Sequence, residues 1–580
     1  MTTLVILRFL GIFAVYTGVT LALPALMFRR ILRGRSLAEQ FLMCYTFGNF
    51  YIINIVFLLQ LLHISNFFTL AGLTAVLSIV IGGRVNRIPL KQQAGNTWHL
   101  FGKLLRGRMK LKSAIFLFLG KCAEGIKRLV KFFYRHIVKN PIQSMLLLGI
   151  GVCLCWIYGR QIILVYGYRA SDIPVHMSWI NEMSRGKIFA KGVYPFGFHC
   201  MIYYLHAVFR FDTYVILCQF FFAQVIFMHL VLLAMLKQLC KTKYIPYIGT
   251  FVFLLGNFWS GQTYSRFYAT LPQEFGMIFV IPSIYFLIRF FQIPKQKLAD
   301  KETRLTLQCF AMAFSLTLAI HFYGTMIAGL CCIGIACGFC FRFLRKEYFC
   351  RIMFTGICSV FLAVLPMGIA FATGTPLQGS LGWGLSVING GKSSSSTEAE
   401  AETDEAETLE VSTGDDKNTV RVVKPDGTVM EIDVSDLPSA QENESGGQMQ
   451  TETTAPAVPK VSFGEKIRKI PGKAKNALSE MSSRILEFII KLDVKNIGYM
   501  ILASFALLLL LGFIFCVFRQ TEYGAMLMSM GFCMWIVTIL LCAGVFGLPP
   551  LMDGARCSIY YVYLLSAALT ALADGLLYMV

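Results

Sequence analysis

The sequence predicts an all-α protein that crosses a membrane many times. Hydrophobic residues make up 56% of the 580 positions, and the mean hydropathy is +0.63. Only 15% of the residues are charged, against about 25% in soluble domains. Apolar stretches of roughly 20 residues recur along the whole chain, and over such a stretch a helix satisfies its own backbone hydrogen bonds inside lipid.

The hydropathy pattern predicts about thirteen transmembrane helices. They cover residues 3–27, 38–62, 67–83, 142–165, 213–236, 244–258, 271–292, 306–323, 325–343, 352–373, 496–518, 523–546 and 557–579. The sixth stretch is short, and the eighth and ninth are nearly continuous around Tyr323 and Gly324. The count is therefore most open to revision at these three stretches.

The net charge of +21 is distributed unevenly. Residues 391–460 contain 16 of the 32 acidic residues and five Lys or Arg, so the rest of the chain holds 48 basic and 16 acidic residues. Basic residues gather in alternate loops, beginning with the four arginines between 29 and 35. By the positive-inside rule these loops face the cytoplasm and the N-terminus lies outside. We therefore expect a multi-pass plasma-membrane protein.

Six regions follow from the spans and the charge pattern. They are an N-terminal three-span region (1–83), a basic cytoplasmic amphipathic segment (84–141), a membrane core (142–390) with an outer loop (166–212), an acidic insertion (391–460), an outer interfacial helix (461–495) and a C-terminal three-span region (496–580).

The basic segment predicts contact with lipid headgroups. Residues 84–140 carry fourteen Lys or Arg and a single acid, Glu124, with apolar residues between them. This pattern is typical of helices that lie on a membrane surface and bind anionic lipids. Nucleic acid is the alternative ligand for such a charge, and we expect none.

The acidic insertion is predicted to be disordered and to lie on the outer side of the membrane. It is rich in Ser, Thr, Glu and Pro, a composition that cannot bury a core. Within it, residues 419–434 alternate apolar and polar positions around Pro425, Asp426 and Gly427, which predicts a β-hairpin.

The outer loop holds a dense set of polar residues. Asp172 and His176 are four residues apart, so both lie on one helical turn if a helix begins near Ile173 with Pro174 in its first turn. A carboxylate beside an imidazole suits proton transfer, cation binding or activation of a hydroxyl. The alternative is structural, with Asp172 capping the helix and His176 resting at the membrane interface.

This loop resembles that of a bacterial membrane family within the GT-C class of polytopic glycosyltransferases. The shared residues are Asp172-x-x-x-His176, Gly186 and Tyr194-Pro195-x-Gly197-x-His199. The likeness covers roughly residues 142–580, is greatest over 166–210, and leaves out the first three spans.

The resemblance implies transfer of a sugar from a polyprenyl-phosphate-linked donor to an envelope glycan acceptor on the outer face of the membrane. In that class an Asp of the outer loop is the usual catalytic base or metal-coordinating carboxylate, which indicates Asp172 as the catalytic residue, with His176 beside it. A divalent cation, Mg²⁺ or Mn²⁺, is the candidate cofactor. This chain lacks a paired Asp-Asp or Asp-Glu at the position, which leaves metal dependence open.

Six further residues are candidates for substrate binding. They are Tyr194, His199, Arg266, Glu274, His321 and Arg556, all near outer ends of spans or in outer loops. Polar groups at such depth are costly and often functional, and arginine suits a lipid phosphate.

Each of the later candidates also has a structural alternative. Arg266 can pair with Glu274, and His321 can make an internal hydrogen bond. Arg556 can anchor a headgroup or pair with Asp553.

Two other classes of function compete with a glycosyltransferase. One is a transporter or flippase of a lipid-linked substrate, and the other is a noncatalytic membrane scaffold whose insertion binds a partner. The transporter hypothesis is weakened because the ionisable residues gather at one face, without an inverted repeat or a charge pair at the membrane midplane. The test is whether Asp172, His199, Arg266, His321 and Arg556 converge on one outward cavity, and their dispersal would favour the scaffold.

Overall fold

The computed structural model describes most of the membrane-spanning sequence and a small part of the insertion. The described residues are 2–87, 95, 98–99, 102–103, 106–107, 110–165, 167–379, 410–413, 419–423, 429–433, 463–490, 496–518, 520–548, 551–552 and 554–579. The chain divides into a membrane unit, Met1–Ile388 with Ala474–Val580, and an insertion unit, Asn389–Lys473. The disorder predicted for 391–460 concerns residues that lie mostly outside the described ones.

The membrane unit is built from helices, and among the described residues eleven are long and apolar enough to cross a membrane. They are α1-η1-α2 (Thr2–Thr17, Gly18–Ala22, Leu23–Met27), α4 (Leu37–Leu61), α5 (Phe67–Asn86), α8-η2-α9 (Pro141–Leu154, Cys155–Gly159, Gln161–Leu164), α12 (Thr213–Leu239), α15-α16 (Pro272–Met277, Val280–Gln292), α17 (Lys301–Ile320), α20 (Lys346–Ala372), α23 (Ile497–Val517), α24 (Thr521–Leu541) and α25 (Gly554–Met579). Two shorter apolar helices are α13 (Ile245–Trp259) and α18 (Phe322–Gly338).

A polytopic helical membrane architecture is therefore confirmed. Every one of the thirteen predicted stretches contains one of these helices. The helices of the sixth and ninth stretches, α13 and α18, are too short to meet the length of a membrane-spanning helix. The sequence already shows the sixth stretch as short and the ninth as nearly continuous with the eighth. The fused pair separates at His321, whose extended backbone (φ −159°, ψ 133°) ends α17 and starts α18.

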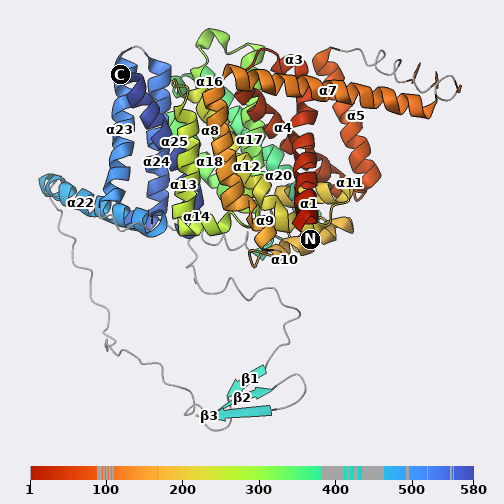
Figure 1. The fold of residues 1–580 in the computed structure, drawn as a ribbon. Coiled ribbons are helices and arrows are strands. Elements are labelled where there is room, and N and C mark those ends of the chain that lie inside the picture. Colours follow the sequence, from red (N-terminus) through yellow and green to blue (C-terminus); the bar gives the residue numbers. More distant parts are fainter. Residues whose placement is uncertain are drawn as a thin grey trace. The chain divides into compact units, whose positions relative to one another are not determined.

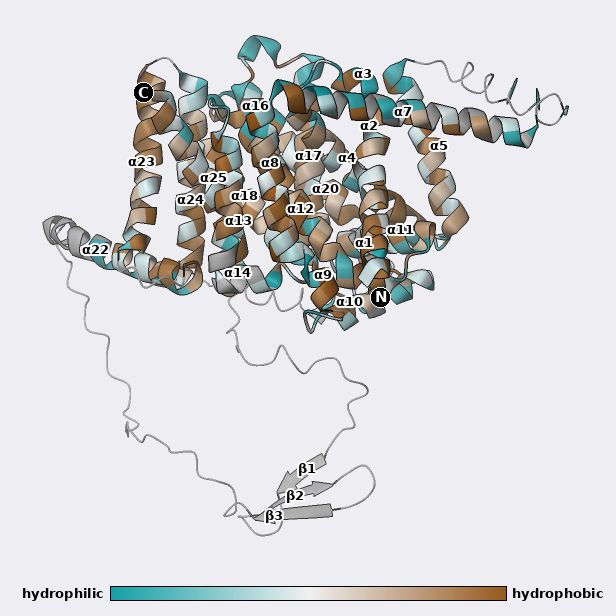
Figure 2. Ribbon diagram, viewed as in Figure 1, coloured by the Kyte–Doolittle hydropathy of each residue, from teal (hydrophilic) through white to brown (hydrophobic). Residues whose placement is uncertain are grey.

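The core lies around α12 and α15-α16. Their most apolar windows are 89% and 94% buried, whereas the corresponding window of α8 is only 17% buried. The mean hydropathy of the three windows is 2.2, 1.7 and 1.8, so hydropathy does not separate the buried helices from the exposed one, and burial does. Figure 2 shows apolar residues along the helices of the bundle.

Glycines allow several helices to pack backbone against backbone. A Cβ at Gly334 of α18 would lie 2.7 Å from the backbone nitrogen of Cys533 in α24, and one at Gly338 would lie 2.2 Å from Ser529 Oγ. Small residues at helix interfaces are a common means of close packing in membranes. The short helix α18 is thereby held against α24 along two turns.

Helices that lie across the bundle cover both of its ends. The amphipathic α7 (Leu111–Lys139) runs across one end, whereas α10 (Ile173–Ser184) and the part of α22 (Phe463–Phe488) that belongs to the membrane unit lie at the other (Figure 1). The N-terminus of α1 lies at the α10 end. This agrees with the predicted topology, in which the basic segment and the outer loop lie on opposite sides of the membrane.

The remaining short helices of this unit are α3 (Arg29–Leu32), α11 (Gly197–Phe209), α14 (Gly261–Arg266), α19 (Cys340–Phe343), η3 (Lys295–Lys297) and η5 (Ala543–Phe546).

Polar contacts tie the helices together at the α7 end. The Arg35 guanidinium contacts the carboxylates of Glu39 and Glu302, each at 2.6 Å, and so links the N-terminal spans to α17. Next to it, Gln238 near the end of α12 donates to Ser36.

Asp574 of α25 anchors the turn after α12 at the same end. Its fully buried carboxylate accepts hydrogen bonds from the backbone nitrogens of Lys241 (2.8 Å) and Thr242 (2.9 Å). It also accepts from Thr242 Oγ1 (2.6 Å) and from the Tyr523 hydroxyl (2.5 Å). Four donors therefore satisfy a single buried charge.

The insertion unit contains a small antiparallel sheet. Strands β1 (Glu410–Thr413), β2 (Thr419–Val423) and β3 (Val429–Asp433) pair in that order. In β2 and β3, Val423 pairs with Val429, so the hairpin predicted around Asp426 is confirmed although its turn lies outside the described residues. Strand β1 was not predicted, because its four residues carry no alternation of their own.

Candidate functional site

Two helices after α9 build the site. As predicted, α10 begins at Ile173 with Pro174 in its first turn. The following helix, α11, begins at Gly197, two residues after Pro195. Gly197 is required here because a Cβ would lie 2.8 Å from the backbone oxygen of Ala319 at the end of α17. The loop is thereby placed beside the ends of α17 and α18.

Asp172 precedes α10 but does not cap it. Its backbone is already helical (φ −75°, ψ −16°), and its carboxylate makes no capping hydrogen bond. The side chain is exposed and accepts a hydrogen bond from Ser171 Oγ at 3.3 Å. The structural alternative of a capping carboxylate is therefore wrong, and the carboxylate remains open to solvent or to a ligand.

His176 contacts a second histidine. Its Nδ1 lies 3.1 Å from Nε2 of His199, and Trp179, one turn further along α10, packs against both rings. Burial lowers the pKa of His176 to about 4, and the nearby Asp172 charge opposes this only in part. Burial, followed by the proximity of His176, places the pKa of His199 well below its ordinary value. Both imidazoles are neutral at pH 7, and His199 Nδ1 is buried without a hydrogen-bond partner.

Tyr194 and His321 face one another next to this pair. Their ring centroids are 6.5 Å apart. Burial raises the pKa of Tyr194 to about 12, and the charges of Arg556 and Asp172 act on it in opposite directions. The Tyr194 phenol is therefore protonated at pH 7, and it can donate a hydrogen bond.

His321 has a structural role that the sequence left open. Its Nδ1 accepts a hydrogen bond from the backbone nitrogen of Tyr323 at 3.2 Å and so caps α18. The pKa of this imidazole is lowered by burial and then by the charges of Arg556 and Arg266. His321 is thus a neutral ring close to both guanidinium groups.

Arg266 is held by a carboxylate. Its Nε lies 2.6 Å from Oε1 of Glu274, and its Nη2 donates to Gln273 Oε1 at 3.1 Å. The Glu274 side chain is only 2% exposed, whereas that of Arg266 is 29% exposed. The pairing alternative for Arg266 is confirmed, and Oε2 of Glu274 stays buried with no hydrogen-bond partner.

Arg556 joins the other side of the site. Its Nη1 donates to the Tyr323 hydroxyl at 3.3 Å, and the guanidinium lies 5.7 Å from the centre of the same ring. Gln273 Nε2 donates to the backbone oxygen of Arg556 at 3.3 Å, which links Arg556 to the Arg266 pair. The alternative partner Asp553 lies outside the described residues.

All eight candidate residues therefore gather at one end of the bundle. We call them the Asp172 cluster: Asp172, His176, Tyr194, His199, Arg266, Glu274, His321 and Arg556. A direct contact or an electrostatic effect links each member to at least one other, and through these links the eight form one connected group. The dispersal that would favour a scaffold is not observed.

Three supporting residues were not assigned a role from the sequence. Trp179 packs on the histidine pair, Gln273 bridges the two arginines, and Tyr323 holds Arg556. Of the three, only Trp179 could have been found from the sequence, because it follows His176 by three residues and so lies on the same helix face.

The residues of the Asp172 cluster do not form a metal site. No group of three or more His, Cys, Asp or Glu side chains that could hold an ion occurs within the described ranges. The candidate Mg²⁺ or Mn²⁺ at Asp172 does not fit these residues, and none of the chemistry below uses it.

No protein-family model, curated protein or solved structure matches the chain. The likeness to the GT-C class therefore rests on the residues of the sequence alone.

Proposed function

We propose that this protein transfers a sugar from a polyprenyl-phosphate-linked donor to an acceptor hydroxyl of an envelope glycan, at the end of the bundle that carries the Asp172 cluster. The observation behind this proposal is the convergence of an exposed carboxylate, two arginines and four neutral hydrogen-bonding rings at the ends of membrane helices. A lipid-linked donor would explain why such a site lies where spans end.

Asp172 would act as the general base. Its carboxylate takes the proton of the acceptor hydroxyl while that oxygen forms a bond to the anomeric carbon of the sugar. The bond between the anomeric carbon and the donor phosphate oxygen breaks, and the polyprenyl phosphate leaves with the electron pair. The absence of a capping bond supports this role, because the carboxylate is not used to hold α10.

Arg556 would stabilise the negative charge on the departing phosphate. A guanidinium suits a phosphate because it offers several N–H donors in one plane. Arg266 is the weaker candidate for this step, since Glu274 at 2.6 Å already neutralises it. We assign Arg266 the task of positioning Gln273 and, through it, the start of α25.

The neutral rings would bind the sugar. Tyr194 is a protonated phenol, and the His176–His199 pair is uncharged. Such groups exchange hydrogen bonds with sugar hydroxyls without competing for the phosphate. His176 additionally lies one turn from Asp172, where it can orient the acceptor.

A transfer assay on the full chain tests the proposal. The purified protein in proteoliposomes is supplied with polyprenyl-phosphate-linked sugars and envelope glycan fragments, and glycan products are measured by mass spectrometry. Asp172→Asn should lower the rate about 10²- to 10⁴-fold, the usual contribution of a general base.

Asp212→Asn is the matched control. Asp212 lies in the same loop and caps α12 by accepting from the backbone nitrogen of Val215 at 3.2 Å. Asn caps about as well as Asp, so this variant should keep the parental rate. Equal rates for the parent and Asp172→Asn would refute the catalytic assignment. Movement of a lipid-linked sugar across the bilayer with no transfer product would favour the flippase.

A further inference from the structure

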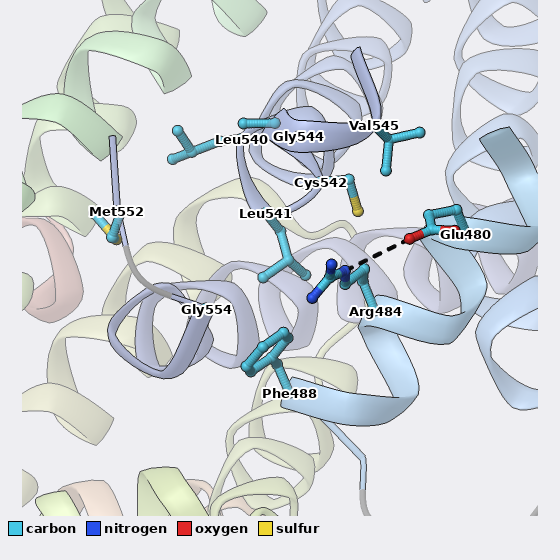
Figure 3. Close-up of a pocket in the computed structure, with 11 residues that line it drawn as sticks. Glu480, Arg484, Phe488, Leu540, Leu541, Cys542, Gly544, Val545, Met552 and Gly554 are labelled. Atoms are coloured by element: carbon cyan, nitrogen blue, oxygen red, sulfur yellow. Dashed lines mark ion pairs between the residues drawn. The ribbon is translucent and has the colours of Figure 1, made fainter. Parts of the chain in front are cut away.

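A pocket opens beside α22, at the end of the bundle where α24 stops and α25 begins. Its volume is about 580 Å³, within the roughly 300–1,000 Å³ of small-molecule sites. Figure 3 shows that α22, the turn after α24 and the start of α25 all contribute to its walls. The lining residues are Glu480, Arg484, Phe488, Leu540, Leu541, Cys542, Ala543, Gly544, Val545, Met552 and Gly554.

The pocket lies at the depth where membrane helices end. The span of α24 ends at Leu541 and the span of α25 starts at Gly554, and residues of both ends line the pocket. α22 crosses this end of the bundle and buries Met481 and Ile485 against it, and Ile489, directly after the helix, is buried too. An amphipathic helix in this position lies among lipid headgroups, so the ligand nearest to the pocket is a bilayer lipid.

Two close contacts hold α22 in place, so this wall of the pocket exists before a ligand binds. A Cβ at Gly498 would lie 2.3 Å from Ser482 Oγ, and one at Gly554 would lie 2.7 Å from the ring of Phe488. Only glycine permits these approaches, which fix α22 against α23 and α25. A preformed wall reduces the entropic cost of binding.

The pocket carries one charge of each sign on an otherwise apolar lining. Arg484 Nε and Glu480 Oε1 are 3.9 Å apart, a loose pair whose side chains are 43% and 52% exposed. Figure 3 shows the two groups side by side at one edge, with Leu541 and Phe488 nearby. Arg484 also contacts Glu487 at 3.2 Å, but Glu487 does not line the pocket.

We propose that this pocket binds the phosphoethanolamine headgroup of a phospholipid from the surrounding leaflet. The phosphate lies against the Arg484 guanidinium and the primary ammonium donates to the Glu480 carboxylate. The apolar lining contacts the glycerol and the first methylenes of the acyl chains. An anionic headgroup would leave Glu480 facing a like charge, and a quaternary ammonium would offer it no N–H donor.

Lipid retention by the full-length protein tests the proposal. The delipidated protein in detergent is mixed with phosphatidylethanolamine, phosphatidylcholine or phosphatidylglycerol of identical acyl chains, and bound lipid is counted by native mass spectrometry. We expect about tenfold tighter retention of phosphatidylethanolamine, as one hydrogen bond between charged groups provides. Equal retention of either other lipid by the parent would overturn the proposal without any variant.

Substitutions then locate the site. Glu480→Gln and Arg484→Gln should each lower phosphatidylethanolamine retention about tenfold. Glu487→Gln is the control, because it removes the same charge from the same helix and contacts the same arginine from outside the pocket. Loss of the preference in Glu487→Gln, or its survival in Glu480→Gln, would show that the lipid binds elsewhere.

Discussion

The two ends of the helix bundle use the same side chain in opposite ways. At one end, Asp574 is fully buried and accepts four hydrogen bonds. At the other, Asp172 is exposed, caps nothing and accepts from a neighbouring serine. A saturated carboxylate has no capacity left for a ligand, whereas an open one at the start of a helix does.

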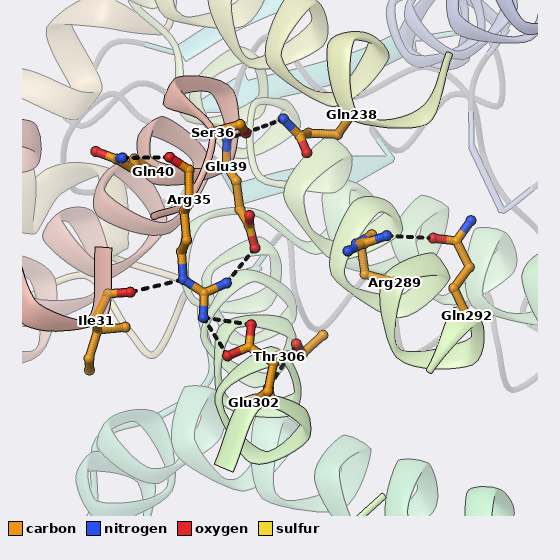
Figure 4. Close-up of polar contacts among 10 residues, drawn as sticks. All are labelled: Ile31, Arg35, Ser36, Glu39, Gln40, Gln238, Arg289, Gln292, Glu302 and Thr306. Atoms are coloured by element: carbon orange, nitrogen blue, oxygen red, sulfur yellow. Dashed lines mark hydrogen bonds and ion pairs between the residues drawn. The ribbon is translucent and has the colours of Figure 1, made fainter. Parts of the chain in front are cut away.

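The polar contacts that surround the two aspartates also differ. At the Asp574 end, Gln238 of α12 also contacts Ser36, and Arg35 lies between Glu39 and Glu302, as Figure 4 shows. Around Asp172, His199 Nδ1 and Glu274 Oε2 are buried without hydrogen-bond partners. The Tyr285 hydroxyl, close to Glu39 and Arg35, is also buried without a partner, so the exposure of the Asp172 carboxylate is what distinguishes the two ends.

The largest expected effect concerns the side of the membrane on which each end lies. A short epitope inserted after Ser394 should be detected on intact cells, and one inserted after Gln93 only after permeabilisation. The excess of basic residues over 84–140 is the reason. Detection of both epitopes from the same side would invalidate the predicted topology and with it the outward placement of the Asp172 cluster.

Removal of the saturated carboxylate should destabilise the fold. Asp574→Ala leaves the donors of Lys241, Thr242 and Tyr523 without their acceptor, at a cost of roughly 2–5 kcal/mol. Thermal unfolding of the detergent-solubilised protein measures this. Asp172→Asn serves as the comparison, because an exposed side chain of this kind should change stability by less than about 0.5 kcal/mol. Similar losses in the two variants would remove the distinction between the ends.

Acidification should weaken the Asp172 end. His176 is neutral when folded, with a pKa of about 4, and takes up a proton near pH 6.5 when unfolded. Its contribution to stability is therefore complete above pH 6.5 and is lost as the pH falls toward 4, by roughly 1 kcal/mol per pH unit. His176→Asn should flatten the fall in unfolding temperature over this window, whereas substitution of the exposed His99 with Gln should leave it unchanged. An unchanged slope in His176→Asn would mean that other groups cause the acid sensitivity.

The smallest effect is expected from the insertion. Replacement of residues 392–459 by a short flexible linker should leave the unfolding temperature and membrane insertion of the protein unchanged, because these residues belong to a separate compact unit. A marked loss of folded protein would show that the β2–β3 hairpin stabilises the membrane unit.

Much of this architecture follows from local sequence. Apolar runs predicted the helices of the bundle, and Pro174 predicted where α10 begins. These features depend on neighbours a few residues away, which the sequence displays directly.

The contacts within the Asp172 cluster could not be predicted in the same way. His176 and His199 are 23 residues apart, and their contact requires α11 to approach α17 at Gly197. The sequence likewise suggested a cap for Asp172, because residue type and position fitted one, yet the backbone angles at that residue exclude it. Side-chain partners at this range are set by helix packing, and no local pattern encodes them.

One helix joins the two ends, and its length has a consequence for the membrane itself. Arg556 and Asp574 both belong to α25, eighteen residues apart, which is about five turns and about 27 Å. They consequently lie on the same face of a single rigid rod, at a spacing close to the roughly 30 Å of a hydrocarbon core. The separation of the two side chains along α25 therefore matches the thickness of the hydrocarbon core that a membrane helix crosses. A thinner bilayer would force the rod to tilt, and that tilt would displace Arg556 from Tyr323 while Asp574 stayed fixed by its four donors.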